Sequence, residues 1–220
     1  MTVLAISPHP DDESIGCGGA LRMHADRGDR VVVAHLTSGE LALSDLPRDE
    51  AWSVRESEAH AAATVLGVAR MEFLHGRDWY LRQEIDVVAG RLAPLLREER
   101  PAVVFLPHPA DDHPDHRTAF DCYRRAVESV PGFGASILAY EVWSPLSRYN
   151  HLIDISHVMP VKLSAIASYK SQLTKFRYDE AIAGLNRYRG VLHAGWTYAE
   201  AYEDLTRSAP GVLVGLLAEV

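Results

Sequence analysis

Short apolar runs alternate with longer amphipathic segments over the first two thirds of this 220-residue chain. We expect strands at residues 3–6, 31–36, 71–74, 103–106 and 137–142. Helices are expected between them at 19–27, 52–66, 85–99 and 117–130. Strands that alternate with helices of this length indicate βαβ units, so the sequence predicts an α/β protein with a mostly parallel sheet flanked by helices. Right-handed crossovers would bring the carboxyl ends of the strands to one edge.

The pattern changes after residue 142. We expect a loop at 143–149, a short strand at 152–155, a helix at 160–173, and further helical stretches at 179–189 and 198–207. A chain of this length can bury one sizeable core. The prediction is therefore a single domain over 1–220, in which a small helical and strand extension at 143–220 completes a core at 1–142.

Composition limits the partners and the compartment. The net charge of −8, without a cluster of lysine and arginine, argues against nucleic acid as a partner. Two isolated cysteines, Cys17 and Cys122, form neither a disulfide framework nor a thiolate metal site and favour a reducing cytoplasm. We expect no membrane association, because no apolar run approaches the ~20 residues of a span and the N-terminus does not resemble a signal peptide. Homo-oligomerisation is left open.

A cluster of polar residues follows the first expected strand. It reads Ser7-Pro8-His9-Pro10-Asp11-Asp12-Glu13. Open α/β sheets bind their ligands at the carboxyl ends of strands. One histidine and one aspartate suit a divalent metal, and a second aspartate remains for acid–base chemistry. Glu13 fits a structural role at the start of the next helix better than a role in the site.

A second cluster, His108 to His116, follows the expected strand at 103–106. His113 and His116 are spaced i, i+3, and Pro114 suits the first turn of a helix. Either cluster alone also fits a turn with an aspartate helix cap. Because both follow strands that end at the same edge, a metal-dependent site is the leading interpretation.

Two neighbouring features have more than one interpretation. We expect Gly16, Gly18 and Gly19 to be turn and close-packing residues where a turn opens into a helix, and the run lacks the lysine of a phosphate-binding loop. Trp79 and Tyr80 fit an aromatic sugar platform or core packing equally well.

The two clusters together resemble the paired motifs of the LmbE/PIG-L family of zinc-dependent N-deacetylases. The similarity extends to Thr37-Ser38-Gly39-Glu40, to Arg55-Glu56-Ser57-Glu58, and to the run Leu-Asn-Arg-Tyr-Arg-Gly at 185–190. It covers roughly the whole chain and implies a Rossmann-like fold with one Zn²⁺ per chain. Members deacetylate N-acetylglucosamine-containing precursors of mycothiol and bacillithiol, and some glycosylated antibiotics.

The resemblance also assigns roles to individual residues. Three residues match the zinc ligands: His9, Asp12 and His116. Asp11 matches the general base, a protonated His113 would stabilise the oxyanion, and Asp115 would orient His113. Arg55 and Asp78 fall where relatives contact sugar hydroxyls. The chain departs from many relatives at 110–112, which we expect to affect the substrate rim rather than the metal.

The expected function is therefore zinc-dependent hydrolysis of the acetamide of an N-acetylglucosamine-type substrate, with Asp11 acting on a zinc-bound water. A small N-acetyl sugar or glycoside is the expected partner. Two alternatives stay open at this point. One is a metal-dependent hydrolase of another bond, such as a thiol-conjugate amidase or a phosphoesterase to which Asp111 and Asp112 contribute. The other is a non-catalytic sugar or nucleotide binder that uses the glycine run.

Overall fold

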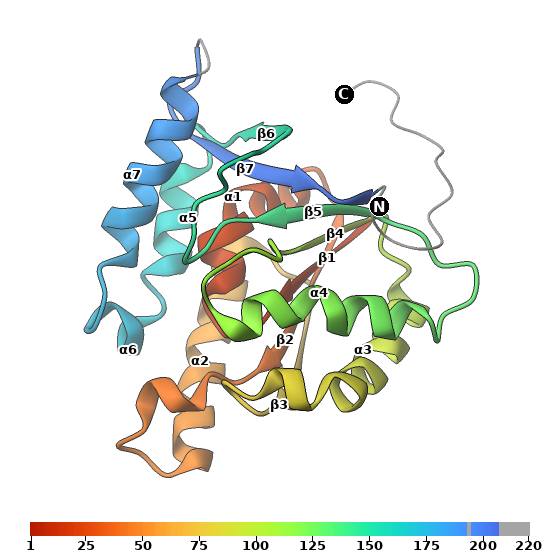
Figure 1. Cartoon of the computed structure of the whole chain (residues 1–220). Coiled ribbons are helices and arrows are strands. Elements are labelled where there is room, and N and C mark those ends of the chain that lie inside the picture. Colours follow the sequence, from red (N-terminus) through yellow and green to blue (C-terminus); the bar gives the residue numbers. More distant parts are fainter. Residues whose placement is uncertain (193–194, 207–220) are drawn as a thin grey trace.

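A seven-stranded sheet forms the centre of the structure, a computed structural model that describes residues 1–192 and 195–206. The strand order is β3-β2-β1-β4-β5-β7-β6 (Figure 1). The strands are β1 (Thr2–Ser7), β2 (Arg30–Thr37), β3 (Arg70–Gly76), β4 (Val103–Pro107), β5 (Ser136–Tyr140), β6 (His151–Asp154) and β7 (Ala199–Asp204). β1 to β5 are parallel, whereas β7 runs antiparallel to both β5 and β6. The expected α/β class with a mostly parallel sheet is confirmed.

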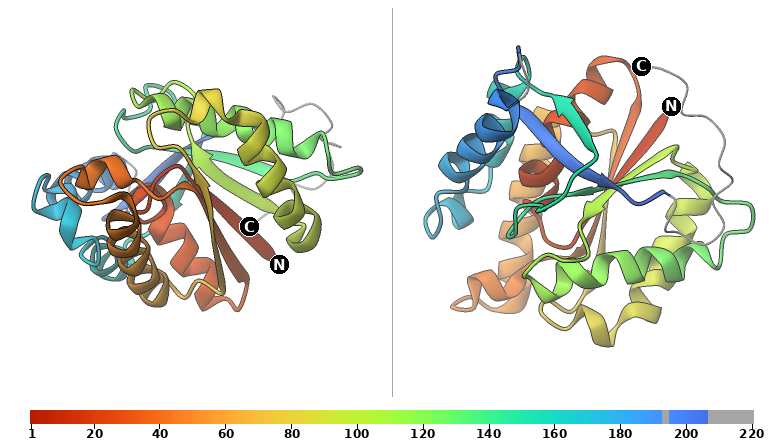
Figure 2. Two further views of the ribbon diagram at one scale, coloured as in Figure 1. Left: turned by 90° about the horizontal axis from the view of Figure 1, so that it is seen from below. Right: turned by 45° about the horizontal axis from the view of Figure 1, so that its top comes forward.

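Helices cover both faces of the sheet (Figure 2). They are α1 (Asp12–Asp26), α2 (Arg48–Leu66), α3 (Ile85–Glu99), α4 (Pro114–Val127), α5 (Met159–Ile166), α6 (Lys170–Leu173) and α7 (Tyr178–Val191), with short 3-10 turns η1 (Glu40–Leu43) and η2 (Leu81–Gln83). α3 and α4 pack on one face, and α1, α2 and α5 pack on the other. No helix in the described ranges is both long and apolar enough to span a membrane.

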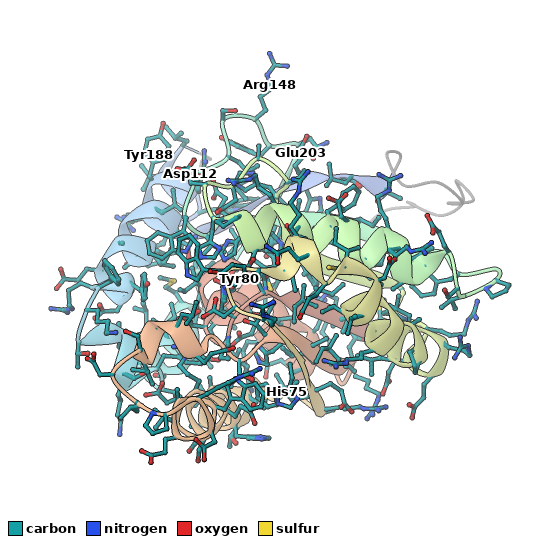
Figure 3. The ribbon with its side chains drawn as sticks, turned by 60° about the horizontal axis from the view of Figure 1, so that its bottom comes forward. His75, Tyr80, Asp112, Arg148, Tyr188 and Glu203 are labelled. Atoms are coloured by element: carbon teal, nitrogen blue, oxygen red, sulfur yellow. The ribbon has the colours of Figure 1, made fainter. Side chains whose placement is uncertain are left out.

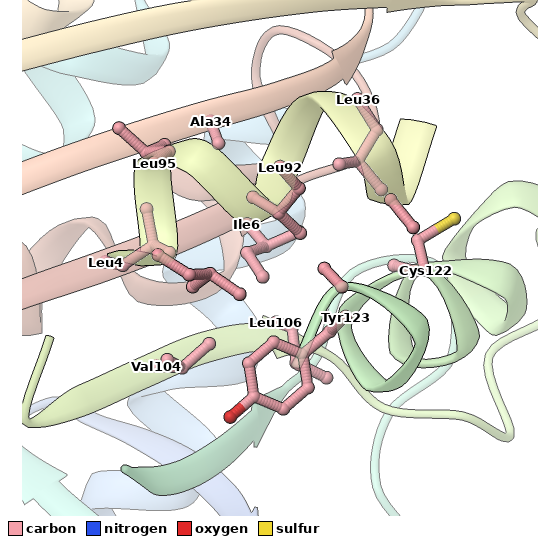
Figure 4. Packing of buried hydrophobic residues seen from close by; sticks show 14 of the residues in the cluster. Leu4, Ile6, Ala34, Leu36, Leu92, Leu95, Val104, Leu106, Cys122 and Tyr123 are labelled. Carbon is pink, nitrogen blue, oxygen red and sulfur yellow. The ribbon is translucent and has the colours of Figure 1, made fainter. Parts of the chain in front are cut away.

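The parallel strands are buried on both sides, which explains why they read as continuous apolar runs in the sequence. In β1, Leu4 and Ile6 pack with Leu92 of α3 and Tyr123 of α4 (Figure 4). The alternate residues of β1 face α1 and α2. The polar clusters begin where these buried strands end, at Ser7 of β1 and at Pro107 of β4.

Three local predictions are wrong. The stretch 198–207 was expected to be helical, but its described part contains strand β7 (Ala199–Asp204). Pairing with β5 and β6 outweighs the helix propensity of its alanines and glutamates. Residue 207 lies outside the described residues. The helix expected at 160–173 is two helices, α5 and α6. The glycine run is not a turn but part of α1, which begins at Asp12.

Close packing explains why glycines occupy this part of α1. A Cβ atom on Gly16 would lie 2.1 Å from the ring of Tyr140, and one on Gly19 would lie 2.6 Å from Ile155. The helix is also broken at Cys17, where φ is −137° and ψ is 15°. Glycine here allows the start of α1 to approach β5 and the segment between β6 and α5 closely.

A buried carboxylate from β7 supports the helix just after this break. Glu200 accepts hydrogen bonds from the backbone N–H groups of Gly19 at 2.8 Å and Ala20 at 2.9 Å. It also pairs with Lys162 of α5 at 2.6 Å and accepts the Tyr202 hydroxyl at 2.6 Å. The second half of α1 is therefore capped from a strand about 180 residues away, which ties the extension after residue 142 to the first helix.

Candidate metal and catalytic site

The two polar clusters lie against each other at the carboxyl edge of the sheet. β1 and β4 are neighbours in the strand order, so the loops that follow them meet. His9 and Asp12 lie between β1 and the first turn of α1, and His116 lies in the first turn of α4. All three side chains are buried.

Three atoms of these side chains form a nearly equilateral triangle. Asp12 Oδ2 lies 3.1 Å from His9 Nδ1 and 3.1 Å from His116 Nε2, and the two nitrogens are 3.3 Å apart. Nitrogen and oxygen ligands at about 2.0–2.2 Å from a tetrahedral zinc are separated by about 3.3–3.5 Å from one another. The residues present therefore fit a zinc ion with three protein ligands and one open position.

Each of the two histidines directs its other ring nitrogen at a carboxylate. His9 Nε2 lies 3.3 Å from Asp115 Oδ2 and 3.2 Å from Asp78 Oδ1. His116 Nδ1 lies 3.2 Å from Asp111 Oδ1. Carboxylates this close favour a proton on the far nitrogen, which leaves the near nitrogen free to bind a metal; the contact of His9 with Asp115 is a hydrogen bond.

This arrangement differs from the sequence-based expectation in two places. Asp115 was expected to orient His113, but its carboxylate contacts His9 and the backbone N–H groups of Trp79 and Leu81. Asp111 was expected to affect only the substrate rim, but its carboxylate contacts His116. The contacts make both aspartates supports of the candidate ligands.

The ionisable groups of the triangle influence one another strongly. Burial lowers the pKa of His9 and of His116, but contacts with Asp12 and the outer aspartates outweigh burial, so that both pKa values lie above the usual range. Burial raises the pKa of Asp12, and the two histidines outweigh this effect and hold it well below its usual value. A bound metal would replace the protons of the histidines as the positive charge facing Asp12.

Asp11 lies beside the triangle in a strained conformation. Its φ is 126°, a region that only glycine adopts readily. Its backbone N–H donates to Glu13 Oε2 at 3.2 Å, and Arg55 Nη2 donates to its Oδ2 at 3.3 Å and to the carbonyl of Pro10. Burial raises the pKa of Asp11 to about 7, against the lowering effect of Arg55. A carboxylate in this state suits proton transfer near neutral pH.

Glu13 takes part in more contacts than a helix-start role requires. Besides the Asp11 N–H, it accepts hydrogen bonds from the hydroxyls of Ser7 at 3.2 Å, Ser14 at 2.7 Å and Tyr169 at 2.5 Å. The sequence assigned Glu13 a structural role, and these contacts specify it: Glu13 holds the backbone that carries Asp11.

His113 caps the N-terminus of α4. Its Nδ1 accepts the N–H of Asp115 at 3.2 Å, which places the ring proton of the neutral imidazole on Nε2. Burial, together with the charges of His9 and His116, lowers the pKa of His113 to about 4. We expected a protonated His113, but these contacts favour a neutral ring that donates through Nε2.

Arg55 and Asp78 both line the cavity above the triangle. Arg55 is almost fully buried and contacts Asp11, whereas Asp78 contacts His9 and accepts the N–H of Leu41 at 2.9 Å. The structure thus places both residues beside the candidate metal and proton-transfer groups. Their contact with sugar hydroxyls remains a prediction.

The cavity has a volume of about 300 Å³ and opens to solvent. Its floor contains His9, Asp11, Asp12 and His113. Its walls are mostly apolar, and aromatic residues from separate parts of the chain contribute to them: Trp79, Trp143, Phe176 and Tyr178. Tyr80, the other candidate platform, does not line the cavity, and both it and Trp79 are exposed rather than part of the core.

Sequence reasoning did not find the role of Asp111, nor the place of Trp143, Phe176 and Tyr178 in the cavity lining. The position of Asp111, two residues before His113, was a usable signal, but its partners Trp143 and Ser144 come from the loop after β5. Phe176 lies between α6 and α7, Tyr178 begins α7, and neither residue belongs to a recognisable motif.

A family model described as PIG-L, GlcNAc-PI de-N-acetylase, matches residues 4–127, which include both polar clusters and more than half of the chain. The chain belongs to the PIG-L family. This confirms the resemblance found in the sequence, and several curated relatives are deacetylases by name.

Three relatives illustrate the similarity. Diacetylchitobiose deacetylase of Thermococcus kodakarensis is 32% identical over 96% of this chain and 84% of its own length. A probable N-acetyl-alpha-D-glucosaminyl L-malate deacetylase 2 of Bacillus cereus is 28% identical over 89% of this chain and 97% of its own. The structure of N,N'-diacetylchitobiose deacetylase from Pyrococcus horikoshii, in complex with its inhibitor MPG, superimposes with a TM-score of 0.81 and 28% identity, covering 95% of this chain and 86% of that one.

Proposed function

We propose that this chain is a zinc-dependent deacetylase that hydrolyses the acetamide of a small N-acetylglucosamine-type substrate. Family membership and the names of its relatives support the reaction class. The observation that carries the mechanism is the triangle of His9 Nδ1, Asp12 Oδ2 and His116 Nε2, with the unligated carboxylate of Asp11 beside it.

The proposed metal site holds one zinc per chain through His9, Asp12 and His116. A zinc ion supplies a polarising charge that makes water a better nucleophile near neutral pH and stabilises negative charge on an amide oxygen. Asp78, Asp115 and Asp111 keep the two imidazoles in the required tautomer and orientation.

Asp11 acts as the proton-transfer group. Its ionised carboxylate accepts a proton from the attacking water and later donates it to the amine nitrogen, since an unprotonated amine leaves poorly. Glu13 and Arg55 fix the backbone and the carboxylate of Asp11, so the group approaches the substrate in one orientation.

His113 is the proposed hydrogen-bond donor to the amide oxygen of the substrate. With Nδ1 held by the backbone of α4, its Nε2–H is the available donor, and it would donate to the oxygen as negative charge develops. The ring lies beside the two candidate histidine ligands, with its centroid 4.6 Å from that of His9 and 4.8 Å from that of His116.

Two alternatives are less well supported. A second metal that uses Asp111 and Asp112, as in a phosphoesterase, conflicts with the contacts of Asp111, whose two oxygens face His116 and three backbone N–H groups, and with the exposure of Asp112. A nucleotide binder that uses the glycine run conflicts with the packing of Gly16 and Gly19 inside α1. We place the reaction in the cytoplasm, in keeping with two free and buried cysteines.

The test compares the wild type with Asp11→Asn and with the nearby exposed control Asp112→Asn, each loaded with zinc. Free amine released from N-acetylglucosamine and its disaccharide is measured together with the metal content. We expect Asp11→Asn to keep about one zinc and to lose on the order of 10²–10⁴ in rate, while the control keeps both. Full activity in the metal-free wild type, or in Asp11→Asn, would overturn the proposal.

A further inference from the structure

Tyr169 is a buried residue of the extension after residue 142, and it contacts both side chains that hold Asp11. It lies between α5 and α6, and only 1% of it is exposed. Its hydroxyl donates to Glu13 Oε1 at 2.5 Å. The guanidinium carbon of Arg55 lies over its ring, 6.0 Å from the centroid, within the range of a cation–π contact. Because Glu13 and Arg55 are the hydrogen-bond partners of Asp11, Tyr169 joins the two supports of the proposed proton-transfer group.

Asp11 needs this support because its backbone is strained. A φ of 126° persists in a residue other than glycine only when the surrounding contacts hold it there. Glu13 Oε2 accepts the Asp11 N–H at 3.2 Å, and Arg55 holds the Asp11 carboxylate and the carbonyl of Pro10. A change in the orientation of the Glu13 carboxylate would therefore release the backbone of Asp11 and turn its side chain.

The orientation of Glu13 depends on Tyr169 more than on its other donors. Ser14 is the next residue along the chain, so its hydroxyl moves together with Glu13. The Ser7 hydroxyl has one proton and lies 2.6 Å from the His9 carbonyl but 3.2 Å from Glu13 Oε2, so the carbonyl competes for it. The Tyr169 ring is packed in the core between the sheet and α1, α2 and α5, which fixes the direction of its hydroxyl. Burial and the charge of Glu13 raise the pKa of Tyr169 well above its usual value, so the hydroxyl remains a donor.

We propose that Tyr169 is a positioning residue for the deacetylation step, and that it acts through Glu13 on the orientation of Asp11. This inference rests on the proposed function, in which Asp11 transfers the proton. Tyr169 is neither one of the proposed zinc ligands nor one of the residues that line the cavity. Removal of its hydroxyl should therefore change kcat and leave KM and the affinity for zinc almost unchanged.

The test compares Tyr169→Phe with Tyr202→Phe, a closely matched control. Tyr202 is also fully buried, and its hydroxyl donates to another buried carboxylate, Glu200 Oε2, at 2.6 Å. Each substitution keeps the ring and removes one hydrogen bond to a buried glutamate. Glu13→Gln and the double variant Tyr169→Phe/Glu13→Gln complete a double-mutant cycle. For each protein we would measure unfolding in urea, zinc affinity by competition with a chelator, and kcat and KM for amine release from N-acetylglucosamine and its disaccharide.

We expect Tyr169→Phe to lower kcat by about 10- to 100-fold, because a displacement of about 1 Å at the reacting group can cost about 100-fold in rate. Its KM and zinc affinity should stay within about twofold of the wild type. Tyr202→Phe should unfold at a lower urea concentration than the wild type, as Tyr169→Phe does, but keep kcat within about twofold. Glu13→Gln should also lower kcat, and the double variant should lose little more than the larger of the two single losses, since both act on the same path.

The inference is overturned if kcat changes by less than about twofold in Tyr169→Phe or in Glu13→Gln. An equal loss of kcat in Tyr202→Phe, or losses that multiply in the double variant, would also overturn it, because each shows a general effect of stability. In these cases the proposed function stands as long as Asp11→Asn, measured beside them, is inactive. Full activity in Asp11→Asn, or no amine release by the zinc-loaded wild type, overturns the proposed function, and this inference with it.

Discussion

Replacing Asp111 by asparagine perturbs the candidate metal site without changing a candidate ligand. Asp111 Oδ1 lies 3.2 Å from His116 Nδ1 and accepts the His113 N–H at 2.9 Å. Its Oδ2 accepts the N–H groups of Trp143 and Ser144, both at 3.1 Å. An asparagine offers one accepting oxygen and one NH₂ group, which can only donate. The NH₂ group must therefore replace an accepting oxygen either on the side of His116 or on the side of Trp143 and Ser144.

Either orientation of the asparagine has a cost. If its NH₂ faces His116, Nδ1 must accept a hydrogen bond and the ring proton moves to Nε2, where it blocks metal binding. If its NH₂ faces Trp143 and Ser144, two backbone N–H groups lose their acceptor. Losing such an outer partner lowers metal affinity by about 10- to 100-fold, which corresponds to roughly 1.4–2.7 kcal/mol.

The assay is competition for zinc between the metal-free chain and a chromophoric chelator, so it needs no substrate. Asp112→Asn is the matched control, because Asp112 is the next residue, carries the same charge and is exposed at the surface (Figure 3). We expect the control to bind zinc as the wild type does. A zinc affinity of Asp111→Asn within twofold of the wild type would refute the argument that Asp111 orients His116.

Glu200→Gln leaves a buried ammonium without its counter-charge, so the free energy of unfolding in urea should fall by about 3–5 kcal/mol, and a loss below 1 kcal/mol would contradict the role given to this pair. Gly16→Ala should destabilise the chain by about 1–3 kcal/mol, because the new Cβ overlaps the buried ring of Tyr140. At Gly18 the nearest atom to a new Cβ is 3.4 Å away, so Gly18→Ala should change stability by less than about 1 kcal/mol. Equal changes in melting temperature for the two variants would refute this distinction. Because the pKa values of His9 and His116 lie above their usual range in the metal-free chain, zinc should displace protons, and its affinity should keep rising as the pH increases above 6.5, the ordinary pKa of histidine. Calorimetry in buffers of different ionisation enthalpy measures those protons, and their absence would contradict the stated protonation.

The sequence predicted those parts of the fold that depend on local patterns. β1 to β5 were recognisable because strands buried on both faces are continuous apolar runs, and the helices between them supply the alternation. β7 was not recognisable, since its pairing partners β5 and β6 decide its conformation and its sequence favours a helix. The hydrogen bonds that support α1 after its kink come likewise from Glu200, a residue that no local pattern links to the glycines.

The candidate site divides in the same way. The rule that parallel strand ends meet at one edge was enough to bring His9 together with His116. The supports of these residues could not be predicted, because Asp111 acts through the loop after β5 and Asp115 turns towards His9 instead of His113. The contact between Trp143 and Phe176 at the cavity joins residues more than 30 positions apart, which no motif records.

The most direct test of the central claim is a titration of the metal-free chain with zinc while acetate release from an N-acetylglucosamine disaccharide is followed. The account predicts no measurable release without metal and a linear rise that ends at one zinc per chain, the stoichiometry of one site formed by His9, Asp12 and His116. Full activity before any zinc is added, or a rise that continues to two zinc ions per chain, would contradict it.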